Sequence, residues 1–406
     1  MNCRFCSNQN LELFLDLDFV PLVDYFLFKK DLNQPETFYP LNVYFCKDCG
    51  LSQLGYIVPA ELLFNENYGY ECSITKTRSD NYSNLAKTIM EKFSLNSNSL
   101  IVDVGSNVGL LLQCFSKLGM NILGVDASKN IVDKANLNGI KTIHGFFNDS
   151  IVNEICSLEG RADVITATNV FAHIQDYDSF MKSLLKLLKE NGVFVFQAPH
   201  LLQLIKNFEY DTIYHEHVCY FSIKPLQKLF ANYGMEIFNI EKTDIDGGSL
   251  TYFVSKKGSY PITNIDKILQ EEEEEGIYSI ERLKRFSQDV KKHKSDLLNL
   301  LLKLKSEGKK IIGVGAPAKG MTLINYCKLD LSILDFLTEK STLKIGKFAP
   351  GMHIPIYEDQ KIFSEKPDYA IILSWNFSKE IMENLKEFRN TGGKFIIPIP
   401  HPKIID

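Results

Sequence analysis

The sequence predicts an α/β protein with a small cysteine-bearing N-terminal domain, a central Rossmann-like domain and a C-terminal Rossmann-type α/β domain. Two close cysteine pairs lie within the first 50 residues. Residues 99–200 and 310–400 each alternate short apolar runs, typical of buried parallel strands, with helical segments. A glycine-containing turn follows the first strand of each region. At roughly 150 residues per domain, 406 residues accommodate two or three domains.

The N-terminal cysteines form two C-x-x-C pairs, Cys3 with Cys6 and Cys46 with Cys49, separated by 39 residues. Two thiolates three positions apart on a tight turn can face one ion, and two such turns supply the four tetrahedral sulfurs that zinc accepts. With all four positions filled by protein, the metal would be structural. Chance thiols or a redox pair remain alternatives.

Composition excludes some partners. The net charge is -5, which is unlike the basic surface of a nucleic-acid binder. No run approaches the ~18 apolar residues that cross a bilayer, and the start has no signal-peptide pattern. We therefore expect a cytoplasmic protein with no nucleic-acid or membrane partner, and the sequence leaves the oligomeric state open.

The strongest cofactor signal is the strand at 99–104, which is followed by Gly105, by Gly109 and then by a helix. Such glycines let the backbone approach a ligand at the carboxyl end of a sheet. The next strand ends about twenty residues later in Asp126, which can accept hydrogen bonds from ribose hydroxyls. Asp103 ends the first strand, where a carboxylate suits a cationic sulfonium better than a diphosphate.

The loop also lacks the G-x-G-x-x-G order of nicotinamide-cofactor sites. Together these features favour S-adenosylmethionine over a dehydrogenase cofactor, and Asp103 could alternatively be a helix N-cap. A third strand at 162–168 leads into 169–174, where the reactive end of the cofactor should meet the substrate. The expected cofactor-binding residues are Asp103, Gly105, Ser106, Asn107, Gly109, Asp126 and Asn169.

The segment 211–222 carries two histidines, an acid and two tyrosines within seven residues. An extended chain would separate Tyr214 and Glu216 from His215 and His217, whereas a turn could bring Tyr214, Glu216 and His217 together. We interpret it as a general-base cluster, because a histidine can take a proton near pH 7. A polar turn at a domain junction is the alternative.

The C-terminal half begins with a helical stretch, 263–308, whose acidic run 271–275 is expected to be a solvated face. A strand at 310–315 then enters a second glycine turn that closes with Lys319, which suits a phosphate or simply starts a helix. Trp375 and Asn376 follow the strand at 368–373. They are either core residues or substrate contacts.

These motifs resemble the nucleotide-sugar C-methyltransferases that make branched deoxysugars of the mycarose and kijanose type. The resemblance covers nearly the whole chain. The shared motifs are the four cysteines and residues 102–107, 124–126, 168–173, 213–217, 247–250, 315–320 and 373–376.

The resemblance implies a zinc-binding N-terminal domain (1–70), a central class I methyltransferase domain (71–258) and a C-terminal α/β domain (259–406) with a helical linker at 263–308. It implies a nucleotide-linked 4-keto deoxysugar as partner, methylated at C3 by S-adenosylmethionine after a base forms the enolate. The implied catalytic residues are His217 as base, with Glu216, Tyr214, His173 and Tyr70. The implied substrate contacts are Lys319, Trp375, Asn376 and Ser249.

Three positions depart from the family pattern. Asp246 and Thr251 stand where a histidine and an arginine usually flank Gly-Gly-Ser-Leu, and Gln197 replaces a strand-end acid. These changes bear on which sugar is used more than on the reaction. An O- or N-methyltransferase on a related sugar nucleotide is the second hypothesis, and a non-enzymatic sugar-nucleotide binder is the third.

Overall fold

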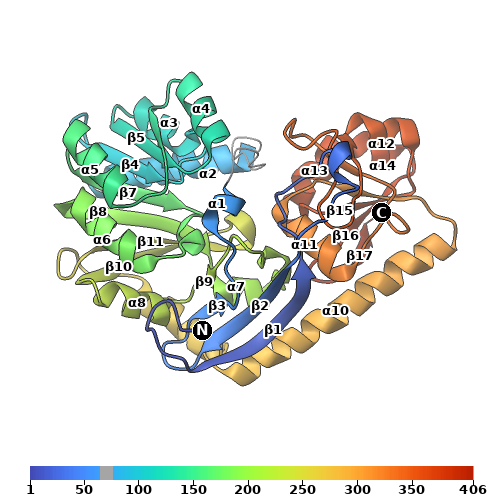
Figure 1. Cartoon of the computed structure of the whole chain (residues 1–406), viewed down its shortest axis with the longest axis horizontal. Helices are drawn as coiled ribbons and strands as arrows, with labels where there is room; N and C mark the ends of the chain where they lie inside the picture. Colours follow the sequence, from blue (N-terminus) through green and yellow to red (C-terminus); the bar gives the residue numbers. More distant parts are fainter. Residues whose placement is uncertain (65–75, 406) are drawn as a thin grey trace.

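The computed structural model describes residues 1–64 and 76–405. Within this part of the chain the strands form three sheets, of four, seven and six strands. The seven-stranded and six-stranded sheets are the cores of two lobes, and the first two strands of the chain run beneath both (Figure 1). The α/β prediction is therefore confirmed, although the N-terminal sheet is not a separate body but joins the lobes.

The N-terminal sheet is antiparallel and has the order β1-β2-β3-β9. Its strands are β1 (Leu11–Val20), β2 (Tyr39–Cys46), β3 (Ser52–Leu54) and β9 (Cys219–Tyr220). Strand β9 comes from the middle of the chain, and its pairing with β3 joins residues more than 160 positions apart. The cysteine-bearing region and the segment rich in histidine and tyrosine thus share one sheet.

The central sheet has the order β10-β11-β8-β7-β4-β5-β6. Strands β4 to β8 are parallel, and β11 and β10 continue the sheet in antiparallel fashion. The bounds are β4 (Leu100–Val104), β5 (Asn121–Asp126), β6 (Thr142–His144), β7 (Ala162–Thr168), β8 (Leu188–Pro199), β10 (Met235–Thr243) and β11 (Ser249–Lys256). The strand order reverses between β4 and β7, and such a switch point is where open α/β sheets bind ligands.

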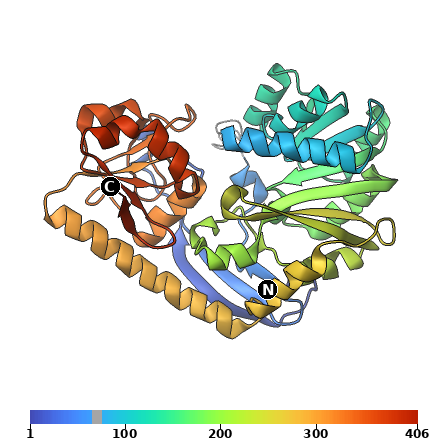
Figure 2. The same cartoon turned by 180° about the vertical axis from the view of Figure 1, so that it is seen from behind.

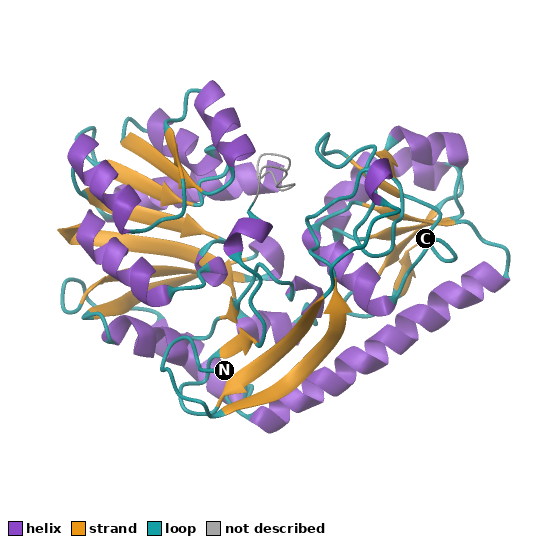
Figure 3. Ribbon diagram, in the orientation of Figure 1, coloured by secondary structure: helices purple, strands orange, loops and turns teal. Residues whose placement is uncertain are grey.

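Helices cover both faces of this sheet, because successive apolar residues of the buried strands point to opposite sides. Ile101 and Val164 pack with α2 and α3 on one face, whereas Val102 and Ile165 pack with α5, α6 and α8 on the other. The helices are α2 (Lys76–Lys92), α3 (Leu110–Lys117), α4 (Lys129–Leu137), α5 (Asp149–Leu158), α6 (Tyr177–Leu187), α7 (Leu201–Lys206) and α8 (Ile223–Ala231). Figure 3 shows this layering.

The C-terminal sheet has the order β14-β13-β12-β15-β16-β17 and is parallel except for β17. Its strands are β12 (Ile311–Val314), β13 (Leu337–Glu339), β14 (Ile356–Glu358), β15 (Tyr369–Ile372), β16 (Lys394–Ile397) and β17 (Lys403–Ile405). Its helices are α11 (Ala318–Cys327), α12 (Gln360–Glu365), α13 (Ser378–Asn384) and α14 (Lys386–Asn390). The order reverses at β12, next to the second glycine turn, so this lobe repeats the Rossmann arrangement.

Two helices, α9 (Ile265–Glu274) and α10 (Ile280–Ser306), connect the lobes, and α10 runs along β1 to the far end of the C-terminal lobe (Figures 1 and 2). The side chains of Leu297, Leu301 and Leu304 on α10 are buried. Short helices complete the fold: α1 (Ala60–Leu63) and the 3-10 turns Lys29–Asp31, Phe171–His173, Tyr210–Thr212, Ile245–Gly247 and Trp375–Phe377. Among the described residues, no helix combines the length and apolar content that crossing a membrane requires.

The expectation that the acidic run is wholly solvated is wrong at Glu272, whose side chain is fully buried. Its carboxylate accepts hydrogen bonds from the backbone N–H of Ile223, at 3.1 Å to each oxygen, and lies 2.6 Å from His200 Nε2. The first backbone N–H group of α8, which has no partner within its own helix, thus donates to a carboxylate from another helix. This contact fastens α9 to the central lobe.

Candidate active site

The four N-terminal cysteines converge on one point, with all four sulfur atoms within 4.8 Å of one another. The Sγ atoms of Cys3 and Cys49 are 3.4 Å apart, and those of Cys6 and Cys46 are 3.6 Å apart. A zinc ion with four Zn–S bonds of about 2.3 Å needs sulfurs roughly 3.8 Å apart, so the donor set fits a tetrahedral ion. All four positions are filled by protein, which makes the site structural.

The second knuckle depends on Gly50, which has a φ of +83° and donates its N–H to the carbonyl of Cys46 at 2.8 Å. A side chain would be strained in this conformation. The turn lets Cys46, at the end of β2, and Cys49 point to the same side. The knuckles pack on the central lobe through Phe5, whose ring lies 4.9 Å from that of Tyr177, edge to face.

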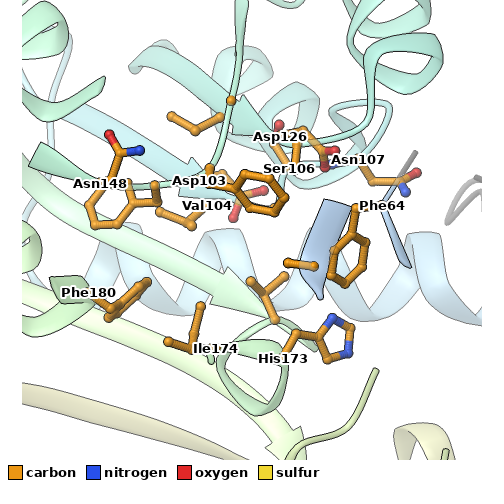
Figure 4. A pocket seen from close by; sticks show the side chains of 18 of the residues that line it. Phe64, Asp103, Val104, Ser106, Asn107, Asp126, Asn148, His173, Ile174 and Phe180 are labelled. Atoms are coloured by element: carbon orange, nitrogen blue, oxygen red, sulfur yellow. Dashed lines mark hydrogen bonds between the residues drawn. The ribbon is translucent and has the colours of Figure 1, made fainter. Parts of the chain in front are cut away.

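At the switch point of the central sheet, a pocket of about 300 Å³ opens beside the turn that follows β4 (Figure 4). Gly105 has a φ of +66°, and an added Cβ would lie 2.3 Å from a methyl carbon of Val170, so only glycine fits there. Asp103, Gly105, Ser106, Asn107, Asp126 and Asn169 all line the pocket.

Asp126 is held by two backbone amides. Its Oδ2 accepts from the N–H of Asn107 and its Oδ1 from that of Ser128, each at 2.9 Å. Each carboxylate oxygen has a further lone pair to offer. Because the side chain lines the pocket, this geometry suits recognition of the two ribose hydroxyls of a nucleoside.

Asp103 is 2% exposed, and its carboxylate accepts a hydrogen bond of 2.6 Å from the hydroxyl of Thr166. Helix α3 begins at Leu110 with Gly109 as N-cap residue, so Asp103 is not a helix cap. Burial raises the pKa of Asp103 to about 7, and the Thr166 hydrogen bond opposes the rise. A buried acid that is reluctant to ionise is a natural partner for a cation.

Gly109 lies apart from the other expected cofactor residues. It is outside the pocket lining, it has a φ of +80°, and an added Cβ would lie 2.6 Å from a methyl carbon of Ile140. The structure therefore gives it a role in starting α3 and packing it.

The sequence reasoning did not single out the aromatic residues of the pocket. They are Phe64, Tyr82, Phe146, Phe147 and Phe180. Such rings suit an adenine base or a shielded sulfonium. The two residues at 146 and 147 carried a signal, because they follow Gly145 directly after β6, at the edge of the sheet where cofactor loops lie.

The Tyr214–His217 stretch forms a turn, and the N–H of His217 donates to the carbonyl of Tyr214 at 3.0 Å. The turn brings the rings of Tyr214 and His217 to a centroid distance of 4.0 Å. His217 Nδ1 lies 2.7 Å from the carbonyl of Thr212. A carbonyl only accepts, so Nδ1 carries the proton and Nε2 is the basic nitrogen of the neutral ring.

His217 lies next to the cofactor pocket because its ring stacks on that of His173, with centroids 5.1 Å apart. His173 lines the pocket and also stacks on Phe64 at 5.7 Å. Burial, followed by the proximity of His217, holds the pKa of His173 well below its usual value. His173 is therefore neutral near pH 7.

Two backbone hydrogen bonds explain why the rings of His173 and His217 lie next to each other. The N–H of Val218 donates to the carbonyl of Ala172, and the N–H of Leu54 on β3 donates to the carbonyl of Val218, each at 2.9 Å. Val218 follows His217 and Ala172 precedes His173. The sheet that carries the cysteine knuckles thus fixes both rings.

The remaining expected catalytic residues are not found beside the His173–His217 pair in the same way. Glu216 is 5% exposed and hydrogen-bonds with Asp24, on the side facing the C-terminal lobe. Tyr70 lies outside the described residues. His215, which alternates with these positions in the sequence, turns the other way and lies 3.3 Å from the carbonyl of Pro40 through Nε2.

The expected substrate contacts lie mostly between the lobes. The Lys319 ammonium is 4.9 Å from the centre of the Trp375 ring and 3.9 Å from Glu209 Oε2, and Trp375 donates its Nε1–H to Asp211 at 2.7 Å. Asn376 follows in the same half-buried turn. Ser249 is buried and donates to the carbonyl of Ile245 at 3.1 Å, which is an internal bond of its own turn.

Two of the departures from the family pattern contact each other. Gln197 on β8 is opposite Thr251 on β11, and its Nε2 donates to the Thr251 hydroxyl at 3.0 Å. Both side chains are buried. The strand-end acid and the arginine are thus replaced together by a neutral hydrogen-bonded pair. The side chain of Asp246 is outside what the structure describes.

Comparison with known proteins agrees with this architecture. Family models match for a zinc binding domain over residues 3–64, a methyltransferase domain over 77–240 and a C-methyltransferase C-terminal domain over 244–400. The C-methyltransferase NovU of Streptomyces niveus is 32% identical over 405 residues, which are 99% of this chain and 96% of that protein.

Other relatives match only part of this chain. The ubiquinone biosynthesis O-methyltransferase of Pelagibacter ubique is 29% identical over 115 residues, 27% of this chain and 48% of that protein. An S-adenosylmethionine-dependent methyltransferase structure from Clostridium acetobutylicum aligns with 44% of this chain and 92% of its own, at 17% identity and a TM-score of 0.36, too distant to bear on function. The full-length match to NovU and the three family matches show that this chain belongs to the S-adenosylmethionine-dependent C-methyltransferases with a zinc-binding domain.

Proposed function

We propose that this C-methyltransferase adds a methyl group to C3 of a nucleotide-linked 4-keto deoxysugar, through an enolate that His217 generates. The observation that carries the proposal is the stack of His217 on His173, which itself lines the cofactor pocket. If C3 of the sugar lies between the two imidazole rings and the cofactor pocket, it is close both to His217, which can accept its proton, and to the methyl group of the cofactor. Bound S-adenosylmethionine supplies an electrophilic methyl group.

His217 suits the base because its Nδ1–H is committed to the Thr212 carbonyl, which directs the basic Nε2 elsewhere. The C3 proton of a 4-keto sugar is acidified by the neighbouring carbonyl. Its removal places negative charge on the C4 oxygen, and a neutral donor such as the His173 ring or the Tyr214 hydroxyl can stabilise that oxygen. His173 is suited to this role because burial keeps it neutral.

The sugar nucleotide would lie between the lobes. We propose that the Lys319 ammonium contacts the diphosphate, that Trp375 and Asn376 contact the nucleoside or sugar, and that Ser249 helps shape the site. The pairing of Lys319 with Glu209 and the bond from Trp375 to Asp211 support this, since they place a cation and an aromatic ring at the junction of the lobes. Working domains of 1–70, 71–258 and 259–406, with linker 263–308, fit this division of tasks.

Hydrogen exchange at the sugar tests the reaction. The enzyme, without methyl donor, is incubated in D₂O with a panel of 4-keto-6-deoxy sugar nucleotides, and the products are analysed by NMR and mass spectrometry. We expect deuterium at C3 only, followed by a C-linked methyl group once S-adenosylmethionine is added. An O- or N-methyltransferase would methylate without exchanging C3, and a binding protein would do neither.

A cytoplasmic location fits the proposal, since the four ligand thiols must stay reduced.

The affinity for S-adenosylmethionine should rise with pH. Burial raises the pKa of Asp103 to about 7, and pairing with the sulfonium favours its ionised form, so binding below pH 7 must expel its proton. We expect the Kd measured by calorimetry to fall about tenfold from pH 6 to pH 8.

S-adenosylhomocysteine is the matched control, because it shares every titrating group of the cofactor but has a neutral sulfur. Its affinity should change far less over the same range. Asp103→Asn should flatten the profile for S-adenosylmethionine. Equal pH profiles for the two ligands in the wild type would contradict the pairing.

A further inference from the structure

Strand β3 is followed by a short segment and then by α1, which ends beside the cofactor pocket. Phe64 is the C-cap residue of α1, and its side chain lines the pocket. The segment before α1 is held in place by Gln175, whose Nε2–H group donates to the carbonyl of Val58 at 2.7 Å. Val58 is fully buried. Because Gln175 closely follows His173 in the chain, the turn that carries His173 also holds the segment that carries Phe64.

Phe64 begins a row of four rings, which we call the four-ring stack. Its ring lies 5.7 Å from that of His173, centre to centre, with 20° between the two planes (Figure 4). His173 contacts His217 at 5.1 Å and 29°, and His217 contacts Tyr214 at 4.0 Å and 34°. Offset, nearly parallel rings at such distances attract one another. The two middle rings of the four-ring stack are the imidazoles of the proposed reaction.

The orientation of the His173 ring depends on these ring contacts. Its Nε2 atom is buried and makes no hydrogen bond to the described residues. His217, in contrast, is fixed through Nδ1 by the carbonyl of Thr212. An imidazole without such a bond at Nε2 keeps its orientation through the side chains packed on it, which here include Phe64. A small change in the direction of a hydrogen-bond donor is costly to catalysis, so this packing matters.

One stretch of the chain contacts both imidazoles of the four-ring stack. The N–H of Leu54, at the end of β3, donates to the carbonyl of Val218, the residue after His217. The same stretch continues through α1 to Phe64, which contacts His173. The spacing of the two imidazoles is therefore set from both sides by residues that belong to the zinc-bearing part of the chain.

We propose that Phe64 is a positioning residue for methyl transfer, because its ring fixes the orientation of the His173 imidazole relative to His217. The inference rests on the proposed function, in which His217 takes the C3 proton and His173 offers a donor to the enolate oxygen. Phe64 acts on the reaction through His173. Its place in the cofactor pocket gives it a second task, contact with the cofactor, which the experiment must separate from the first.

Deuterium exchange at C3 separates the two tasks, because it needs both imidazoles but no methyl donor. Phe64→Leu keeps apolar bulk but removes the flat ring, and we expect it to slow exchange about tenfold at saturating sugar nucleotide. Phe64→Tyr keeps a ring and should restore most of the rate. Gln175→Leu removes the bond to Val58 and should slow exchange in the same direction. An unchanged exchange rate in Phe64→Leu would overturn the proposal, whatever happens to the Kd for S-adenosylmethionine.

The matched control is Leu62→Ala, because Leu62 lies on the same helix and is 48% exposed. Its exchange rate, KM and Tm should equal those of the wild type. A purely structural Phe64 would give a different result from the one we expect: Phe64→Leu would lower Tm and raise KM for the sugar nucleotide, while the exchange rate at saturation would stay at the wild-type value.

NMR of the histidine side chains tests the positioning without any substrate. The chain has eight histidines, so the imidazole signals can be assigned by comparison with His173→Asn and His217→Asn. We expect Phe64→Leu to shift the ring signals of His173 and, through that ring, those of His217, whereas Leu62→Ala should leave both unchanged. Unmoved His217 signals in Phe64→Leu would overturn the proposal. If the wild type exchanges C3 of no sugar tested, the proposed function fails, while the NMR shifts still decide whether Phe64 orients His173.

Discussion

Replacing His217 by asparagine is expected to lower kcat for methyl transfer by about 100-fold or more, with cofactor affinity nearly unchanged. Asparagine can keep the hydrogen bond to the Thr212 carbonyl but has no basic nitrogen at the position of Nε2. General-base catalysis contributes typically about 10²- to 10⁴-fold, which corresponds to roughly 3–5 kcal/mol of transition-state stabilisation. The cofactor pocket does not include His217 among its lining residues, so binding should persist.

Exchange at C3 separates the chemistry from binding, because it needs the base but no methyl donor. We expect His217→Asn to slow this exchange as much as it slows methylation. His215→Asn is the matched control: the same turn carries it, but its ring faces Pro40 and Tyr39. That variant should lose some stability and keep its exchange rate. Turnover of His217→Asn within about twofold of the wild type would show that His217 is not the base.

The features that local sequence predicted are those in which short-range chemistry decides the structure. Apolar runs gave the parallel strands, Gly105 marked a turn that only glycine can make against Val170, and two C-x-x-C pairs predicted the convergent sulfurs. In each case, residues close together in the sequence determine the local geometry. The turn at Tyr214 was one of two open alternatives, and the structure selects it.

The features that sequence could not predict depend on partners far apart in the chain. In the sequence, Glu272 is one of five consecutive glutamates, yet its environment is set by His200 and the start of α8. Asp24 lies in an ordinary loop, and only the packing of the lobes brings Lys344 and Glu216 to it. Strand β9 has two residues, too few for a periodic signal, and pairs with a strand near the N-terminus. Long-range contacts of this kind carry no local pattern.

Removing the zinc is expected to slow methyl transfer strongly while leaving most of the cofactor affinity. The metal would join the Cys3–Cys6 knuckle to the Cys46–Cys49 knuckle at the end of β2. Strand β2 pairs with β3, and β3 holds Val218 through the bond from Leu54. Val218 in turn is bonded to Ala172, so the spacing of His173 and His217 depends on this sheet. Zinc binding to such thiolates is coupled to folding and involves on the order of 10 kcal/mol. We expect the apparent Tm to fall by at least about 10 °C and kcat by about 100-fold or more.

The variant Cys46→Ser, compared with Cys156→Ser, separates the metal from thiol chemistry in general. Cys156 is a partly buried thiol on α5 outside the sulfur cluster, so its replacement should leave zinc content, Tm and activity unchanged. Cys46→Ser should lose the metal as measured by elemental analysis, and with it the C3 exchange of the sugar. The Kd for S-adenosylmethionine should weaken by no more than about fivefold, roughly 1 kcal/mol, because among the described lining residues only Ala60 and Phe64 belong to the zinc-bearing part. Full activity after loss of the metal would show that packing alone holds the two histidines together, and that β3 reaches Val218 without help from the knuckles.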